Sequence, residues 1–224
     1  EKVLIERLSA VAALGAKQND RSEQSLKYLL GSEKVSSADK DKLIESLIGL
    51  YQSTKSNDKL ISAAQQYFKQ GGGNSRVRLP LAQALAIDKQ YAAALEELRK
   101  KQEADKGAKP AEAELRVGIF VHSRLKNDVA LLEVLKTTVS LYPKTDYWID
   151  LIGVLLRKPG LSKRQEMDIY SLMEEVGALV DEEDYLEMMD VALKVGLPKQ
   201  VLRLAGKAQK ANVITQANLS KLEA

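Results

Sequence analysis

The sequence predicts an all-α fold, a right-handed superhelical solenoid of stacked helix–turn–helix units, and two observations lead to it. Ala, Leu, Lys, Glu and Gln dominate the 224 residues and aromatic residues make up only 5%, a composition that favours helix over strand. Candidate helix starts recur near residues 2, 38, 75, 110, 146 and 182, and a step of about 36 residues is typical of helical repeat arrays. One amphipathic hairpin cannot bury its own apolar face, so such units stack.

Composition excludes several classes of function. The 34 basic and 31 acidic residues are interspersed and leave a net charge of +3, so no basic face indicates a nucleic-acid binder. The chain has no cysteine, which excludes disulfides, thiolate chemistry and Cys-ligated zinc. No apolar run approaches the roughly 18 residues of a membrane span. The first residue is Glu1 and a helix is predicted from Lys2, so we expect a trimmed or processed product.

The first two units are predicted from apolar stripes and capping residues. Lys2–Gly15 carries apolar residues at helical spacing and is followed by a second helix over Ser22–Leu30. The next pair begins at Ser36-Ser37, which cap helix N-termini well, and returns from Asn57-Asp58. Gly71-Gly72-Gly73 follows. Because no strand precedes these glycines, a flexible loop between helices is favoured over a phosphate-binding loop.

The third and fourth units are marked by prolines and polar turns. Pro80 lies about a turn and a half inside the helix expected from Asn74-Ser75. It therefore predicts either a kink in that helix or a helix that starts at Pro80 itself. Tyr91 falls near the turn and the small Ala94 follows three residues later. The fourth unit begins at Pro110 and turns at Asn127-Asp128.

The last two units are the clearest. Trp148, Leu151, Ile152 and Leu155 place one apolar face on the helix that Thr145-Asp146 begins. The connection Arg157–Gln165 is longer than its counterparts, and the sixth unit starts near Asp181–Asp184. A final helix is predicted over Val213–Leu222, so residues 1–224 are expected to form a single domain of six hairpins plus a C-terminal helix.

The units resemble tetratricopeptide repeats (TPR). Trp148 and Leu151 match the large residue and the leucine early in that repeat, and Leu81-Ala82, Tyr91 and Ala94 match later positions, with Lys89 in place of the turn glycine. The stretch 142–173 is also similar to TPR proteins of proteobacteria that are typically made with a secretion signal. This resemblance implies a periplasmic location, with the cytoplasm as the alternative.

The resemblance further implies a binding scaffold in which the first helix of each unit lines a concave groove. Transferred residue by residue, it gives candidate groove positions for a protein or peptide partner: Arg76, Gln83, Glu114, Val121, Arg124, Asp146, Ile149, Arg157, Glu183, Leu186 and Asp190.

A search for catalytic chemistry finds little. His122 is the one histidine of the chain and lies mid-helix between apolar neighbours, so it is interpreted as a partly buried or groove-facing helix residue and not as a base or metal ligand. Asp181–Asp184 is interpreted as a helix first turn, where acidic groups offset the macrodipole, and not as a paired-carboxylate site. We therefore expect neither enzymatic activity nor a cofactor.

Two further groups of residues are candidates for contact with a partner. The basic run Arg99-Lys100-Lys101 lies at a predicted helix C-terminus, where cations are favoured, so a solvated face is preferred over an RNA contact. Trp148, Met188 and Met189 are interpreted as core residues, while Tyr147 is left open between core and partner anchor.

The sequence thus predicts a non-catalytic scaffold that binds a partner segment in the groove of a TPR-like superhelix. Two alternatives stand beside it: an accessory module of a cell-envelope enzyme system that acts on cell wall or glycan, and RNA binding. Exposed apolar surface at either end would indicate that further repeats or another subunit continue the stack.

Overall fold

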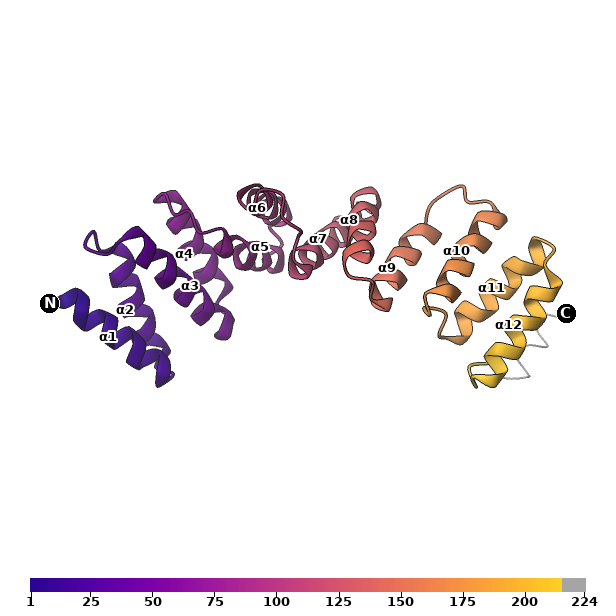
Figure 1. The fold of residues 1–224 in the computed structure, drawn as a ribbon, viewed down its shortest axis with the longest axis horizontal. Helices are drawn as coiled ribbons and strands as arrows, with labels where there is room; N and C mark the ends of the chain where they lie inside the picture. Colours follow the sequence, from indigo (N-terminus) through magenta and orange to yellow (C-terminus); the bar gives the residue numbers. More distant parts are fainter. Residues whose placement is uncertain (215–224) are drawn as a thin grey trace. The chain divides into compact units, whose positions relative to one another are not determined.

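A computed structural model of the chain describes residues 1–214 and places them in helices joined by short turns (Figure 1). No strand occurs in this described part, and none of its helices is long and apolar enough to cross a membrane. The predicted helix over Val213–Leu222 lies, apart from its first two residues, outside the described range. The chain divides into two compact units, Glu1–Lys126 and Asn127–Ala224, and the single repeat domain over the whole chain stays a prediction.

Unit 1 is a succession of antiparallel helices in which each packs on its neighbours in the chain. Its elements are α1 (Lys2–Gly15), α2 (Asn19–Gly31), α3 (Ser37–Ser53), α4 (Asn57–Lys69), the 3₁₀ turn η1 (Ser75–Val77), α5 (Arg78–Ile87), α6 (Tyr91–Ala104) and α7 (Glu112–Arg124). Its core is a continuous layer of aliphatic side chains at three- and four-residue spacing, with Leu26, Leu47 and Leu85 fully buried. Each such leucine contributes about 1.5–3 kcal/mol of transfer free energy.

Unit 2 follows the same plan. Its elements are α8 (Asp128–Leu141), α9 (Thr145–Leu156), α10 (Lys163–Glu175), α11 (Glu182–Lys194) and α12 (Pro198–Lys210). Met188 and Met189 are fully buried in its core, as the sequence predicted. Trp148 is only half-buried, whereas its neighbour Tyr147 is buried. The aromatic residue that completes the packing of α9 is therefore Tyr147.

The predicted capping residues begin the helices. The Ser36 hydroxyl accepts a hydrogen bond from the Asp39 amide at 3.2 Å, and the Asp181 carboxylate accepts one from the Asp184 amide at 3.0 Å. Ser162 and Gln165 form a reciprocal capping box at the start of α10. Pro80 lies in the first turn of α5, where its missing amide hydrogen has no helical partner to lose.

Most turns within the hairpins use a lysine where the TPR pattern has glycine. Lys17, Lys55 and Lys89 adopt a left-handed backbone, with φ between 53° and 62°, and Lys126, the last residue of unit 1, does so as well, with φ of 52°. The connection from α9 to α10, Arg157–Ser162, is longer than the turn Thr54–Ser56 between α3 and α4, as expected, and its left-handed residue is Gly160. Left-handed backbone is costly for a residue with a Cβ, so these turns are held by the helices that they join.

Candidate functional site

Helix α4 of unit 1 lies between two surface grooves, and most of its polar side chains line one groove or both. The first, called the lysine groove, lies among α2, α3 and α4 and has a volume of about 710 Å³. The second, called the glutamine groove, lies between α4 and the turn from α5 to α6 and measures about 800 Å³. Asp58, Ser62, Gln66 and Gln70 line both.

The lysine groove has an apolar floor and a cationic rim. Val35, Ile44 and Leu47 lie at its base and are buried in the core of unit 1. Lys27, Lys40 and Lys59 reach it from three different helices. Asp58 is the one acidic residue among the side chains that line it, so the lining carries more positive than negative charge.

Glu23 fixes two of these lysines. Its carboxylate accepts hydrogen bonds from the ammonium groups of Lys27 at 2.7 Å and Lys59 at 2.8 Å, which joins α2 to α4. Burial by itself raises the pKa of Glu23, but the hydrogen bonds from Lys27 and Lys59 outweigh it and bring the pKa to about 2. Glu23 is therefore a carboxylate at every physiological pH and holds both cations in place. Lys40 forms no ion pair with any described residue, so its charge is available to a ligand.

One end of the lysine groove is closed by the triple-glycine segment, which follows α4 and is a loop, as predicted. Gly72 lies directly under the ring of Tyr67: a Cβ placed on it would be 2.3 Å from the ring carbon Cζ. The Tyr67 hydroxyl is hydrogen-bonded to the Asp41 carboxylate and also accepts a hydrogen bond from the Asn74 amide at 3.0 Å. The glycine thus permits a close contact that ties the loop to α3 and α4.

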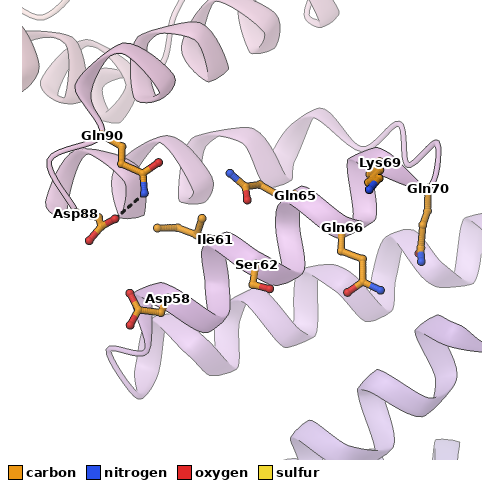
Figure 2. Close-up of a pocket in the computed structure, with 9 residues that line it drawn as sticks. All are labelled: Asp58, Ile61, Ser62, Gln65, Gln66, Lys69, Gln70, Asp88 and Gln90. Atoms are coloured by element: carbon orange, nitrogen blue, oxygen red, sulfur yellow. Dashed lines mark hydrogen bonds between the residues drawn. The ribbon is translucent and has the colours of Figure 1, made fainter.

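The glutamine groove is more open and more polar. Its lining includes Gln65, Gln66, Gln70 and Gln90, which carry amide groups able to donate and accept hydrogen bonds. Figure 2 shows Gln65 and Ile61 on the α4 side facing Gln90 across the groove, with Gln90 hydrogen-bonded to Asp88 at 2.6 Å. Such a surface suits the backbone of an extended peptide, which needs both kinds of partner.

The groove residues that the TPR resemblance implied in unit 1 lie elsewhere, since none of them lines either of these two grooves. Arg76 is exposed and lies 3.7 Å from Glu45, and Gln83 is half-buried on α5. Glu114 forms an ion pair with Lys101 at 3.1 Å. Arg124 is exposed and its guanidinium lies over the Phe120 ring.

Val121 requires a correction, because it is fully buried in the core of unit 1 and offers no side-chain surface to a partner. The TPR resemblance implies a groove position for it only through the general geometry of first helices. In α7 the apolar stripe that includes Val121 packs inward, and the exposed side of that turn is occupied by Arg124.

The corresponding residues of unit 2 are mostly exposed. Asp146, Ile149, Arg157 and Glu183 are exposed, and Leu186 and Asp190 are half-buried. Two of them already have charged neighbours within the unit, because Arg157 lies 3.8 Å from Asp128 and Asp190 lies 2.5 Å from Lys194. Their role in partner binding stays a prediction.

The groups with catalytic potential are spread through the structure. His122 is half-buried, its Nδ1 has no hydrogen-bond partner within residues 1–214, and burial lowers its pKa, so the neutral imidazole is favoured. No cluster of three or more His, Asp or Glu side chains suited to a metal ion occurs in that range. The basic run is neutralised: Arg99 contacts Glu96 and Glu103, Lys100 contacts Glu97, and Lys101 contacts Asp105.

Sequence reasoning missed both grooves because it assigned binding to first helices, whereas α4 is the second helix of its hairpin. The sequence carries a signal for the glutamine groove. Within six residues the sequence has three uncharged polar side chains, Gln65, Gln66 and Gln70, whereas charged residues dominate the polar positions of the other helices. The lysine groove has no comparable signal, since its three cations come from three helices.

Comparison with known proteins places the fold. No family model matches the sequence, and no curated protein matches it. Among solved structures, MamA (AMB-1) aligns with a TM-score of 0.58 at 13% identity, over 79% of this chain and 91% of that one. PilW, a widely conserved type IV pilus biogenesis factor, aligns with a TM-score of 0.50 at 11% identity, over 98% of both chains. Both contain tetratricopeptide repeats, and the chain has the all-α, stacked-hairpin fold of these TPR-like solenoids.

Proposed function

We propose that the chain is a non-catalytic scaffold that binds a segment of a partner protein, and that the segment lies in the lysine groove. The observation that carries this proposal is the combination of an apolar floor with three lysines on the rim, two of them held by Glu23. Cations that are already positioned lose little side-chain entropy on binding. The fitting ligand is a segment in which acidic residues flank a Leu, Ile or Phe side chain.

Lys40 offers the sharpest test, because its charge has no partner among the described residues. Short peptides from a random library would be selected on the immobilised chain and sequenced. We expect enrichment of an apolar residue flanked by Asp or Glu, and we expect Lys40→Glu to weaken the selected peptides about tenfold. Lys42→Glu is the matched control, because Lys42 lies on the same helix, is exposed, and does not line the groove.

Peptides that bind the Lys40→Glu variant as tightly as the wild-type chain would contradict this assignment. The face of the first helices is the second candidate surface, and reversal of Arg76, Arg124 and Asp190 tests it with the same peptides. If only that triple variant loses binding, the scaffold function stands and the site moves to the first helices. Peptides that bind neither surface specifically would count against the scaffold function.

A location in the cell envelope is part of the proposal. Two things support it: the similarity of stretch 142–173 to TPR proteins made with a secretion signal, and the likeness of fold to PilW, a pilus biogenesis factor. An accessory role beside a cell-wall enzyme would fit the same location. Fractionation of cells by osmotic shock, with the native gene product detected by antibody, tests it, and recovery only with cytoplasmic markers would refute it.

A further inference from the structure

Helix α1 turns its most apolar face to solvent. Leu4, Ile5, Leu8 and Val11 are 63%, 53%, 65% and 72% exposed, although residues at this spacing form one continuous stripe on a helix. The exposed residues Ala12, Gly15 and Ala16 continue the same face toward the C-terminal end of α1. From Leu4 to Ala16 this face carries no charge. We call it the α1 apolar face.

The opposite face of α1, which packs on α2, is small and polar. Ala10 and Ala13 are buried on this face, and α2, on which it packs, contributes the fully buried Ser22 and Ser25. The Ser25 hydroxyl donates a hydrogen bond to the Glu6 carboxylate at 2.7 Å. The helix is therefore fixed by alanine contacts, the half-buried Val3 and hydrogen bonds, while the larger side chains of the α1 apolar face lie in water. An exposed contiguous apolar stripe of this kind marks an interaction surface.

We propose that a second copy of this chain covers the α1 apolar face, with the two α1 helices antiparallel about a two-fold axis that passes by Leu8. In this register Leu4 of one copy faces Ala12 of the other, and Ile5 faces Val11. The pairing sets Leu4 against the small Ala12 and sets aliphatic side chains against each other at Ile5–Val11 and at the axis, so the apolar stripe is covered along its length. A two-fold interface must be self-complementary, and this face is.

The charges at the two ends of α1 agree with this arrangement. Glu1 and Lys17 are both exposed and stand at opposite ends of the helix. In this register Glu1 of one copy lies opposite Gly15 of the other, two residues from Lys17 and within reach of its long side chain, twice by symmetry. A parallel pair would instead place like charges side by side.

A head-to-tail assembly fits the charges less well. Leu202 on α12 is 75% exposed, but Lys199 and Lys210 lie on the same exposed side of that helix. Docking α12 on the α1 apolar face would bury cations against a surface without anions, at a desolvation cost. The self-complementary pair is therefore favoured over an open filament.

The first experiment is sedimentation equilibrium of the purified chain over a concentration series. We expect a monomer–dimer equilibrium, and we expect Leu8→Glu to weaken dimerisation at least tenfold because two carboxylates would meet at the axis. Leu202→Glu adds the same charge at an equally exposed leucine and should leave the dimer unchanged. Circular dichroism checks that both variants keep the wild-type helix content, which is expected because both side chains are solvent-exposed.

The second experiment tests the register. The chain contains no cysteine, so Leu8→Cys introduces a single thiol, and a short thiol-to-thiol cross-linker should join two copies efficiently. Val11→Cys lies off the axis and should cross-link much more slowly. A chain that stays monomeric at all concentrations would refute the proposal. A dimer that Leu8→Glu leaves intact would also refute it. So would a monomeric chain that binds phosphatidylglycerol vesicles in a flotation assay and loses this binding in the Leu8→Glu variant.

Discussion

The carboxylate of Glu174 on α10 accepts two hydrogen bonds from the guanidinium of Arg203 on α12, at 2.6 and 2.5 Å. Lys207, one turn further along α12, adds a third at 2.9 Å, and the Glu174 side chain is only 13% exposed. Glu23 has the same role in unit 1, where it joins α2 to α4. In each unit a glutamate whose side chain is 13–16% exposed thus links the second helices of two successive hairpins through half-exposed cations, and such charge-assisted hydrogen bonds are stronger than neutral ones.

We predict that Glu174→Gln destabilises the chain in a pH-dependent way. The hydrogen bonds from Arg203, helped by Lys207, hold the pKa of Glu174 at about 2, below its usual 4.5. A folded-state pKa below the unfolded value gives stability that is present above about pH 5 and is lost as the pH falls toward 2. At pH 7 the variant should lose about 1–2 kcal/mol of unfolding free energy, and the difference should shrink by about pH 3.

Urea unfolding followed by circular dichroism at both pH values measures this effect. Glu175→Gln is the control, since Glu175 is exposed and forms no ion pair with a described residue. A Glu174→Gln difference that stays constant from neutral to acidic pH would show that the pairing with Arg203 contributes no proton-linked stability.

Asp184 should show the opposite dependence. Burial, together with the neighbouring Asp181 and Glu187, raises the pKa of Asp184 to about 6 from a usual 3.8. A raised carboxyl pKa means that ionisation destabilises the fold, so the contribution of this group is best below about pH 4 and is lost as the pH rises through 6. Asp184→Asn should therefore stabilise the chain at pH 8 by roughly 1 kcal/mol, after allowance for partial exposure.

The comparison for this variant is Glu183→Gln, which removes the same charge from an exposed position in the same helical turn. Both residues lie near the N-terminus of α11, where a negative charge is favoured by the macrodipole. Thermal unfolding at pH 8 and pH 4 decides between the two effects. If Asp184→Asn is destabilising at pH 8, the macrodipole outweighs burial at this position.

The order of the helices was predictable from the sequence because two local signals coincide at most boundaries. The first helices begin close to the predicted steps, at Lys2, Ser37, Ser75 (as η1), Glu112, Thr145 and Glu182. Capping residues such as Ser36, Asn127 and Asp181 act through hydrogen bonds within a few residues. Such short-range chemistry is visible in a single sequence, and so is the apolar periodicity that fixes where helices lie.

The surfaces were less predictable because they depend on which helices lie next to each other. The face of α1 that packs, through Ala10 and Ala13, is smaller and more polar than the face that stays in water, so apolar periodicity alone points to the wrong face. The lysine groove exists because α2, α3 and α4 bring Lys27, Lys40 and Lys59 to one rim. Tyr147 and Trp148 differ by one position in the helical phase, and packing selected Tyr147 for the interior.

Gly72 is predicted to be irreplaceable for steric reasons. Gly72→Ala would place its Cβ 2.3 Å from the Tyr67 ring, which is held at its hydroxyl by Asp41 and Asn74 and so cannot move freely. We expect a loss of about 1–3 kcal/mol, the usual cost of overpacking. Gly73→Ala is the matched control, because nothing lies within 4 Å of a Cβ there. In a Tyr67→Leu background the cost of Gly72→Ala should fall, and an undiminished cost would show that the ring is not its cause.

Glycine should be the better residue at two turns that now carry lysine. Lys55 and Lys89 have φ of 53° and 62°, and each lies just after the end of a helix. The residue that follows each lysine donates its backbone amide to a carbonyl of that helix, from Ser56 to Tyr51 at 2.9 Å and from Gln90 to Leu85 at 2.8 Å. Glycine removes the strain of about 1–2 kcal/mol that a left-handed residue with a Cβ carries. It also makes the unfolded chain more flexible, and this larger entropy loss on folding offsets about half of the gain. We therefore expect Lys55→Gly and Lys89→Gly each to gain about 0.5–1 kcal/mol in chemical denaturation, and the double variant to gain about their sum, since the two turns belong to different hairpins. Lys42→Gly, in the exposed interior of α3, should instead lose about 1 kcal/mol. A loss of stability at either turn would mean that the lysine side chain contributes more to the turn than its backbone strain costs.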